Sequence, residues 1–288
     1  MDSAWDIASH TKVYSDELWA LEEIDTSGYV CWGCGIPVYP AAYAKRNAQR
    51  PHFRLYRNTA HRYGCHANTE MGIIEHGRRS SVREHLEKSS DLSPAGLALT
   101  PANTGKDRGE ARLRNGSAAI TTSREYAATL RPICRAFIHF PHDRDMSLRV
   151  PNAVGNTYAT IFKKLPAELP RIFPENKIFY SKLSNSRLIP EADSLLLHLA
   201  PYAWEGRKPT GEYLLNLGWS RWNARQKYGI EHGLEAARLG AIEAKKARKK
   251  DEAWVFFLGQ QDRARPELFH VSDPRLVYVM IGDISVPV

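Results

Sequence analysis

The chain has 288 residues, of which 43% are apolar and 25% are charged, as in ordinary globular proteins. This composition excludes disorder over the whole chain, and four cysteines in 288 residues are too few for a disulfide scaffold. Forty basic and thirty-two acidic residues give a net charge of +8, which suits a polyanionic partner.

The pattern predicts two short helices in the first third of the chain. Residues 13–24 place apolar side chains at helical spacing after Ser15. Residues 80–88 open on a capping-box pattern from Ser81 to Glu84. The stretch 89–123 is rich in Ser, Pro, Gly and Thr and has no aromatic residue, so it is interpreted as a linker.

The second half alternates strand-like and helical patterns. We expect a strand at 133–140, a short helix at 156–165, and a long helix at about 221–250 that begins after Ser220 and contains three glycines. Further strands are expected at 177–183, 194–199, 212–217, 254–258, 267–271 and 276–281. The predicted fold is therefore α+β. A zinc-stabilised module at 1–88 and a linker at 89–123 precede a domain at 124–288 with a mostly antiparallel sheet and one long helix.

The sharpest motif is a Cys-x-x-Cys knuckle formed by Cys31 and Cys34, with Gly33 easing the turn. A closed structural zinc site needs two more nitrogen or sulfur ligands from a separate segment. His52 and Cys65 fit, and His61 and His66 compete for the last two places. Mixed imidazole and thiolate ligands favour zinc over an iron–sulfur cluster, and no βαβ pattern surrounds the knuckle to indicate a redox motif.

These residues resemble the N-terminal zinc-binding region of CoiA-like competence proteins. The similarity covers about residues 5–70: the run 29–38 around the knuckle, the Pro-His-Phe at 51–53, and then His61 and Cys65. The resemblance implies a bacterial cytosolic protein that acts on DNA, in DNA uptake, mobile-element control or phage defence. It also implies that the metal ligands are Cys31, Cys34, His52 and Cys65.

In that family, a nuclease domain of the restriction-endonuclease type follows the zinc region. Such a core needs an acidic residue on one strand and a Glu-x-Lys on the next. The candidate Glu243-Ala244-Lys245 lies about fifty residues after Asp193, inside the expected long helix. The resemblance therefore favours a nucleic-acid role over a catalytic one.

The charge distribution points to the surface that would bind nucleic acid. No acidic residue occurs between Asp25 and Glu70, and the stretch carries Lys45, Arg46, Arg50, Arg54, Arg57 and Arg62, interleaved with aromatic residues. Basic side chains neutralise phosphates and exposed rings stack on unpaired bases. A competing interpretation pairs this stretch with residues 1–25, which hold one lysine and seven acidic residues. A second basic run at 245–250 is interpreted as the solvated end of the long helix.

The favoured function is thus a zinc-containing nucleic-acid-binding protein, with DNA the expected ligand. One alternative is a metal-dependent nuclease built on His139, His142, Asp143 and Asp145, although Pro141 also fits a simple turn there. Another is a protein-interaction adaptor in which the zinc is purely structural. The aromatic residues of the second half form either an oligonucleotide-binding sheet surface or the core. With no apolar run of roughly 18 residues and no secretory signal at 1–6, a cytoplasmic location is expected.

Overall fold

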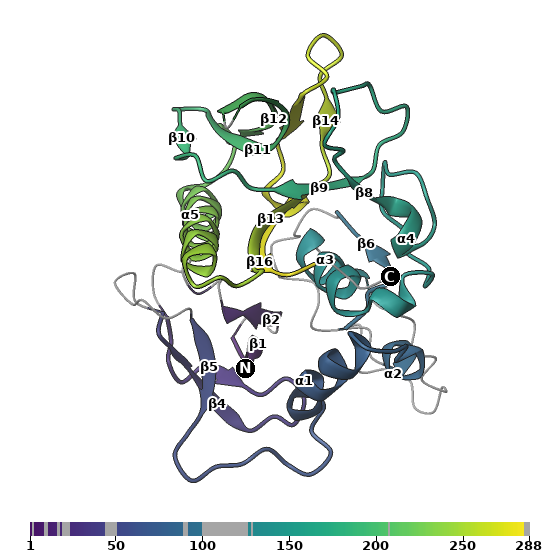
Figure 1. Ribbon diagram of the computed structural model, residues 1–288. Coiled ribbons are helices and arrows are strands. Elements are labelled where there is room, and N and C mark those ends of the chain that lie inside the picture. Colours follow the sequence, from purple (N-terminus) through teal and green to yellow (C-terminus); the bar gives the residue numbers. More distant parts are fainter. Residues whose placement is uncertain are drawn as a thin grey trace.

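The computed structural model describes residues 1, 3–8, 11–15, 18, 24–43, 51–88, 92–99, 126, 127, 129–206 and 208–284. These residues form a mixed α+β structure whose sheets are mostly antiparallel, as predicted. They enclose three hydrophobic cores, one in the N-terminal region and two on opposite faces of a central sheet. Figure 1 shows the helices and strands that contribute to these cores.

The N-terminal region is a five-stranded antiparallel sheet of order β2-β1-β3-β4-β5. Its strands are β1 (Ser3–Asp6), β2 (Thr11–Tyr14), β3 (Tyr29–Val30), β4 (Pro37–Ala41) and β5 (His52–Leu55). Met1 and Phe53 exchange two backbone hydrogen bonds of 2.9 Å, which join β5 to the residue that precedes β1. The sheet therefore curls around a small core of Ala4, Leu18, Tyr29, Cys31, Val38, Phe53, Cys65 and Ala67.

The helix predicted at 13–24 is wrong at its start, because Val13 and Tyr14 belong to β2 and pair with β1. β-branched and aromatic residues suit a pleated strand better than a helix. Residues 16, 17 and 19–23 of that prediction lie outside the described residues.

Helix α1 (His66–Gly77) connects the N-terminal core to the next one. Ala67 at its start packs in the N-terminal core, whereas Ile74 near its end packs with the second core. Helix α2 (Arg83–Lys88) follows, as the sequence predicts, with Val82 and Leu86 in that same second core.

The central sheet has the order β16-β13-β9-β8. It consists of β8 (Phe162–Lys164), β9 (Ile178–Lys182), β13 (Glu252–Phe257) and β16 (Val277–Gly282), with only the β8–β9 pair parallel. Successive side chains of β13 point to opposite faces. Trp254 and Phe256 enter the second core, while Val255 and Phe257 enter the third.

Two helices cover the second-core face of this sheet. They are α3 (Leu130–His139) and the short α4 (Tyr158–Ile161), and the 3-10 turn η2 (Pro141–Asp143) follows α3. The strand predicted at 133–140 is therefore wrong. Leu130, Ile133, Cys134 and Phe137 are buried at helical spacing, whereas a strand would bury every second residue. The helix predicted at 156–165 shortens to α4 because Phe162–Lys164 pairs with β9 as β8.

The third core lies between the central sheet, the long helix α5 (Ala224–Lys246) and a second five-stranded sheet. That sheet has the order β10-β11-β12-β15-β14, formed by β10 (Ile189–Pro190), β11 (Ser194–Glu205), β12 (Lys208–Gly218), β14 (Gln260–Gln261) and β15 (Leu268–Val271). The 3-10 turn η3 (Pro274–Leu276) precedes β16. The six predicted strands and the long helix are confirmed, although Asn223 rather than Ser220 caps α5.

The predicted linker contributes to the second core. Leu92 and Leu97 are buried there, and β6 (Gly96–Leu97) pairs in parallel with β7 (Tyr126–Ala127). Residues 100–125 lie outside the described residues, so the domain boundary within 89–123 stays a prediction.

Candidate metal centre

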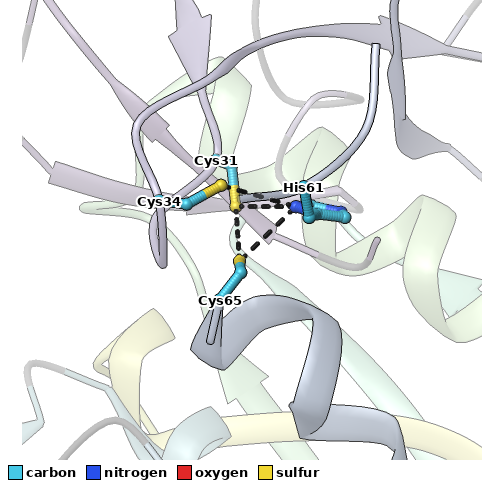
Figure 2. Close-up of side chains that lie close together, drawn as sticks. All are labelled: Cys31, Cys34, His61 and Cys65. Carbon is cyan, nitrogen blue, oxygen red and sulfur yellow. Dashed lines mark hydrogen bonds between the residues drawn. The ribbon is translucent and has the colours of Figure 1, made fainter. Parts of the chain in front are cut away.

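Four ligand-type side chains converge in the N-terminal region: Cys31, Cys34, His61 and Cys65 (Figure 2). All four ligand atoms lie within 4.8 Å of one another, and the described residues contain no second group of this kind. His61 Nδ1 is 3.4 Å from the sulfurs of Cys31 and Cys65 and 3.6 Å from that of Cys34. The Cys31 and Cys65 sulfurs are 3.6 Å apart, so the thiols are close without forming a disulfide.

These separations match a tetrahedral centre. With metal–sulfur bonds of about 2.3 Å and metal–nitrogen bonds of about 2.0 Å, tetrahedral angles place two sulfurs about 3.8 Å apart and a sulfur and a nitrogen about 3.5 Å apart. The measured distances of 3.4–3.6 Å lie within a few tenths of these values. The cluster is thus shaped to hold one metal ion.

The first two ligands come from the turn that joins β3 to β4. The backbone nitrogen of Cys31 donates to Ile36 O at 2.7 Å, and that of Gly35 donates to Cys31 O at 2.8 Å. Gly35 adopts φ +70°, a left-handed conformation that closes the turn and that favours glycine because it has no Cβ. The glycine the turn requires is therefore Gly35, whereas Gly33, expected to ease the turn, is not in the left-handed region.

The other two ligands come from the turn that leads into α1. The backbone nitrogen of Cys65 donates to Arg62 O at 3.1 Å, and Gly64 sits at φ +73°. Cys65 is the N-cap residue of α1, so the start of that helix fixes the position of this ligand. Each pair of ligands is therefore held by one tight turn.

Burial differs among the thiols. Cys31 and Cys65 are 1% and 3% exposed, and burial raises the pKa of the Cys31 thiol to about 12. For Cys34, burial alone would also raise the pKa, but hydrogen bonds from the backbone nitrogen of Arg62 and from His61 outweigh it and lower the pKa to about 6. A metal cation held by these side chains would replace the thiol protons and stabilise the three thiolates.

The structure replaces one predicted ligand. His52 was the expected third ligand, but it lies on β5 opposite Ala41 and is not part of the cluster; its place is taken by His61. His61 precedes Cys65 by four residues, so one turn supplies both ligands. The side chain of His66, the other competitor, lies outside the described residues. The signal in the sequence was the pairing of two short spacings, Cys-x2-Cys and His-x3-Cys.

The basic residues predicted to bind nucleic acid divide into two sets. Lys45, Arg46 and Arg50 lie outside the described residues. The other three, Arg54, Arg57 and Arg62, are exposed. In the part of the chain that the structure describes, none of these three side chains forms an ion pair.

The candidate catalytic residues His139, His142, Asp143 and Asp145 do not form a site. Asp143 is 2% exposed and accepts hydrogen bonds from the Ser81 hydroxyl and the Val82 backbone nitrogen. Asp145 pairs with Arg83, and His139 Nδ1 lies 3.4 Å from a guanidinium nitrogen of Arg78. The two carboxylates thus hold the start of α2 against the segment that follows α3, and His142 is exposed.

Most aromatic residues of the central sheet and of β15 belong to the interior, with Tyr180 and Tyr278 partly buried against the second core. Trp254, Phe256, Phe257 and Phe269 are buried in the two cores of the central sheet. Cys134 is also buried there, as expected for a small apolar residue. Of the two interpretations of these rings, their burial favours the core.

Comparison with known proteins finds no matching family model, no matching curated protein and no matching solved structure. The arguments about function therefore rest on the site itself. Within the described residues, no helix combines the length and apolar character needed to cross a membrane.

Proposed function

We propose that the metal centre is a structural zinc site. Three thiolates and one imidazole are a donor set typical of structural zinc, and four protein ligands leave no open position for a substrate. The N-terminal core is small, and a bound metal ion adds folding free energy that such a core cannot supply alone.

Metal analysis of the full chain purified without added metal tests this assignment. We expect about one zinc per chain, as in closed four-ligand sites. His61→Ala should lose the zinc, whereas His52→Ala, the matched histidine of the same module, should retain it. If His52→Ala loses the zinc and His61→Ala retains it, the ligand is His52. A wild-type protein that is folded but contains no metal would refute the site.

The zinc-held module is the nucleic-acid-binding part of the protein. The observation that carries this proposal is the stretch between Asp25 and Glu70, which has six basic residues and no acidic one. Arg54, Arg57 and Arg62, its basic residues that the structure describes, are exposed and form no ion pair with another described residue. A polyanion is the partner whose charge matches such a surface, through phosphate contacts that release counterions.

The metal ligands and the basic residues lie on the same or neighbouring backbone segments. Arg62 lies next to the ligand His61, its carbonyl accepts from Cys65, and its backbone nitrogen bonds to the Cys34 sulfur. Arg54 lies on β5, whose partner β4 continues from the turn that carries Cys31 and Cys34. The zinc thus holds the segment that presents the arginines.

Binding of single- and double-stranded DNA and RNA across a salt series, with and without Mg²⁺, tests the function. We expect salt-dependent binding with intact substrate, and the triple variant Arg54→Glu, Arg57→Glu, Arg62→Glu should abolish it and flatten its salt dependence. The matched control reverses three exposed charges at the end of α5, Lys246→Glu, Lys249→Glu and Lys250→Glu, and should retain binding. If both triple variants lose nucleic-acid binding equally, the net charge of the protein causes the binding and the assigned surface is refuted.

A further inference from the structure

The N-terminal sheet has one face that is not packed against its core. Side chains alternate along each strand, so Ala4, Val38 and Phe53 point into the core while their neighbours point outward. The pairing aligns Trp5 with Val30 and Val30 with Pro37 in one row across the sheet.

The next row continues this outward face onto β5. Tyr39 pairs with Arg54, and the exposed Tyr56 follows directly after β5. The rings of Tyr39 and Tyr56 lie 5.1 Å apart at an interplanar angle of 53°. One surface, the outward face of Trp5, Val30, Pro37, Tyr39, Arg54 and Tyr56, thus combines three aromatic rings with a cation.

Trp5 and Tyr56 on this face are exposed to solvent, and Tyr39 is half-buried. Trp5 is 38% exposed and Tyr56 40%, so each residue keeps more than a third of its surface accessible to a ligand. Tyr63, in the turn between His61 and Cys65, is fully exposed. Exposed rings clustered with a basic side chain are the usual device for stacking on unpaired bases.

Helix α1, which follows the metal ligands, is unsuited to a duplex groove. α1 contains no lysine or arginine and carries Glu70 and Glu75, which the phosphates of a major groove would repel. Its first residue follows a metal ligand and its end is anchored in the second core, so neither end is free to enter a groove. The sheet face, by contrast, offers rings and one arginine side by side.

We propose that the outward face binds single-stranded nucleic acid, with bases stacked on Tyr39, Tyr56 and Trp5 and phosphates held by Arg54. This inference rests on the proposed function and names its ligand class. The stretch between Asp25 and Glu70 is basic and contains no acidic residue, so it favours a polyanion over an apolar protein segment as the ligand of this face.

Fluorescence anisotropy with labelled oligonucleotides tests the inference on the zinc-loaded full chain. The probes are oligo(dT), oligo(rU) and a duplex of the same length. We expect the single strands to bind at least about tenfold more tightly than the duplex. Comparing the affinities for oligo(dT) and oligo(rU) shows whether the preferred ligand is DNA or RNA.

Ring substitutions distinguish stacking from charge. Tyr39→Leu with Tyr56→Leu should weaken single-strand binding by about tenfold or more with little change in salt slope, while Tyr39→Phe with Tyr56→Phe should keep most of the affinity. Trp204→Leu, an exposed ring on β11, is the matched control and should leave binding unchanged. Unchanged zinc content in each variant excludes unfolding of the module.

Three results would overturn the inference. Equal affinity for duplex and single strands, or Leu variants that bind like the wild type, would refute stacking while the proposed function stands. Equal loss in the Phe and Leu variants would refute a role for the rings. Failure of every probe to bind would refute the proposed function itself.

Discussion

The carboxylate of Asp143 accepts a hydrogen bond of 2.9 Å from the backbone nitrogen of Val82. A distant segment thereby supplies an acceptor for the start of α2. The first four N–H groups of a helix have no partner within it. The Ser81 hydroxyl, which the sequence assigns to a local capping box, donates to Asp143 and also accepts from the backbone nitrogen of Arg83 at 3.4 Å. A residue expected to be a catalytic candidate thus has a structural role.

Asp143→Ala should lower the free energy of unfolding by about 1–3 kcal/mol, because it leaves the buried Val82 N–H without an acceptor. Asp143→Asn should cost less, since its carbonyl oxygen still accepts one bond. His142→Ala, at the exposed neighbouring position, should leave stability unchanged. Urea denaturation measures all three, and an Asp143→Ala variant as stable as the wild type would contradict the capping role.

Gly35→Val should weaken metal binding by roughly tenfold. A β-branched residue at φ +70° costs about 1–2 kcal/mol, and this turn positions both Cys31 and Cys34. Nothing lies within 4 Å of a Cβ at this position, so the effect is conformational and not steric. Gly35→Asn should retain more affinity because asparagine tolerates the left-handed region. Competition with a chromophoric chelator measures the difference, and equal affinities for the Val and Asn variants would contradict this account.

Removal of the metal should unfold the N-terminal core while the two other cores persist. No residue of the N-terminal core belongs to either of the others, and α1 passes from this core to the second. Hydrogen exchange after EDTA treatment should show lost protection in β3, β4 and β5 and retained protection in β9 and β13. EDTA presaturated with zinc is the control, and loss of protection throughout the chain would show that all the cores depend on the metal.

The pair Asp273 and Arg275 should make stability depend on pH. Burial alone would raise the pKa of Asp273, but hydrogen bonds from the side chain and backbone of Arg275 outweigh it and hold the pKa below its ordinary value of 3.8. A carboxyl whose pKa is lower in the folded state than in the unfolded state stabilises the protein at pH values above its unfolded-state pKa. This stabilisation is lost as the pH falls through the folded-state pKa.

Asp273→Asn should therefore be less stable than the wild type near neutral pH, and the difference should shrink as the pH falls from about 5 to about 3. Urea denaturation across this range measures it. Asp193→Asn, an exposed carboxylate, should show little difference at any pH. A difference that does not change with pH would refute the ionic contribution of Asp273.

The sequence alone determined the features that depend on neighbouring residues. The pattern at 254–258 predicts a strand, and β13 forms it, whereas its burial on both faces between two cores came from the tertiary structure. The long helical pattern predicts α5, and the Cys-x2-Cys spacing predicts one side of the metal centre. These patterns are local because strand alternation, helical periodicity and a tight turn each involve only a few consecutive residues.

Only the tertiary structure decided which distant groups meet. The choice of His61 over His52 depends on how the turn before α1 approaches the β3–β4 turn, which no spacing specifies. Leu130–His139 forms a helix because one stripe of its surface packs on the central sheet, although its apolar run also fits a strand. Asp143 is a helix cap because packing brings it to Val82 across sixty-one positions of the chain, and its residue type alone is equally compatible with catalysis.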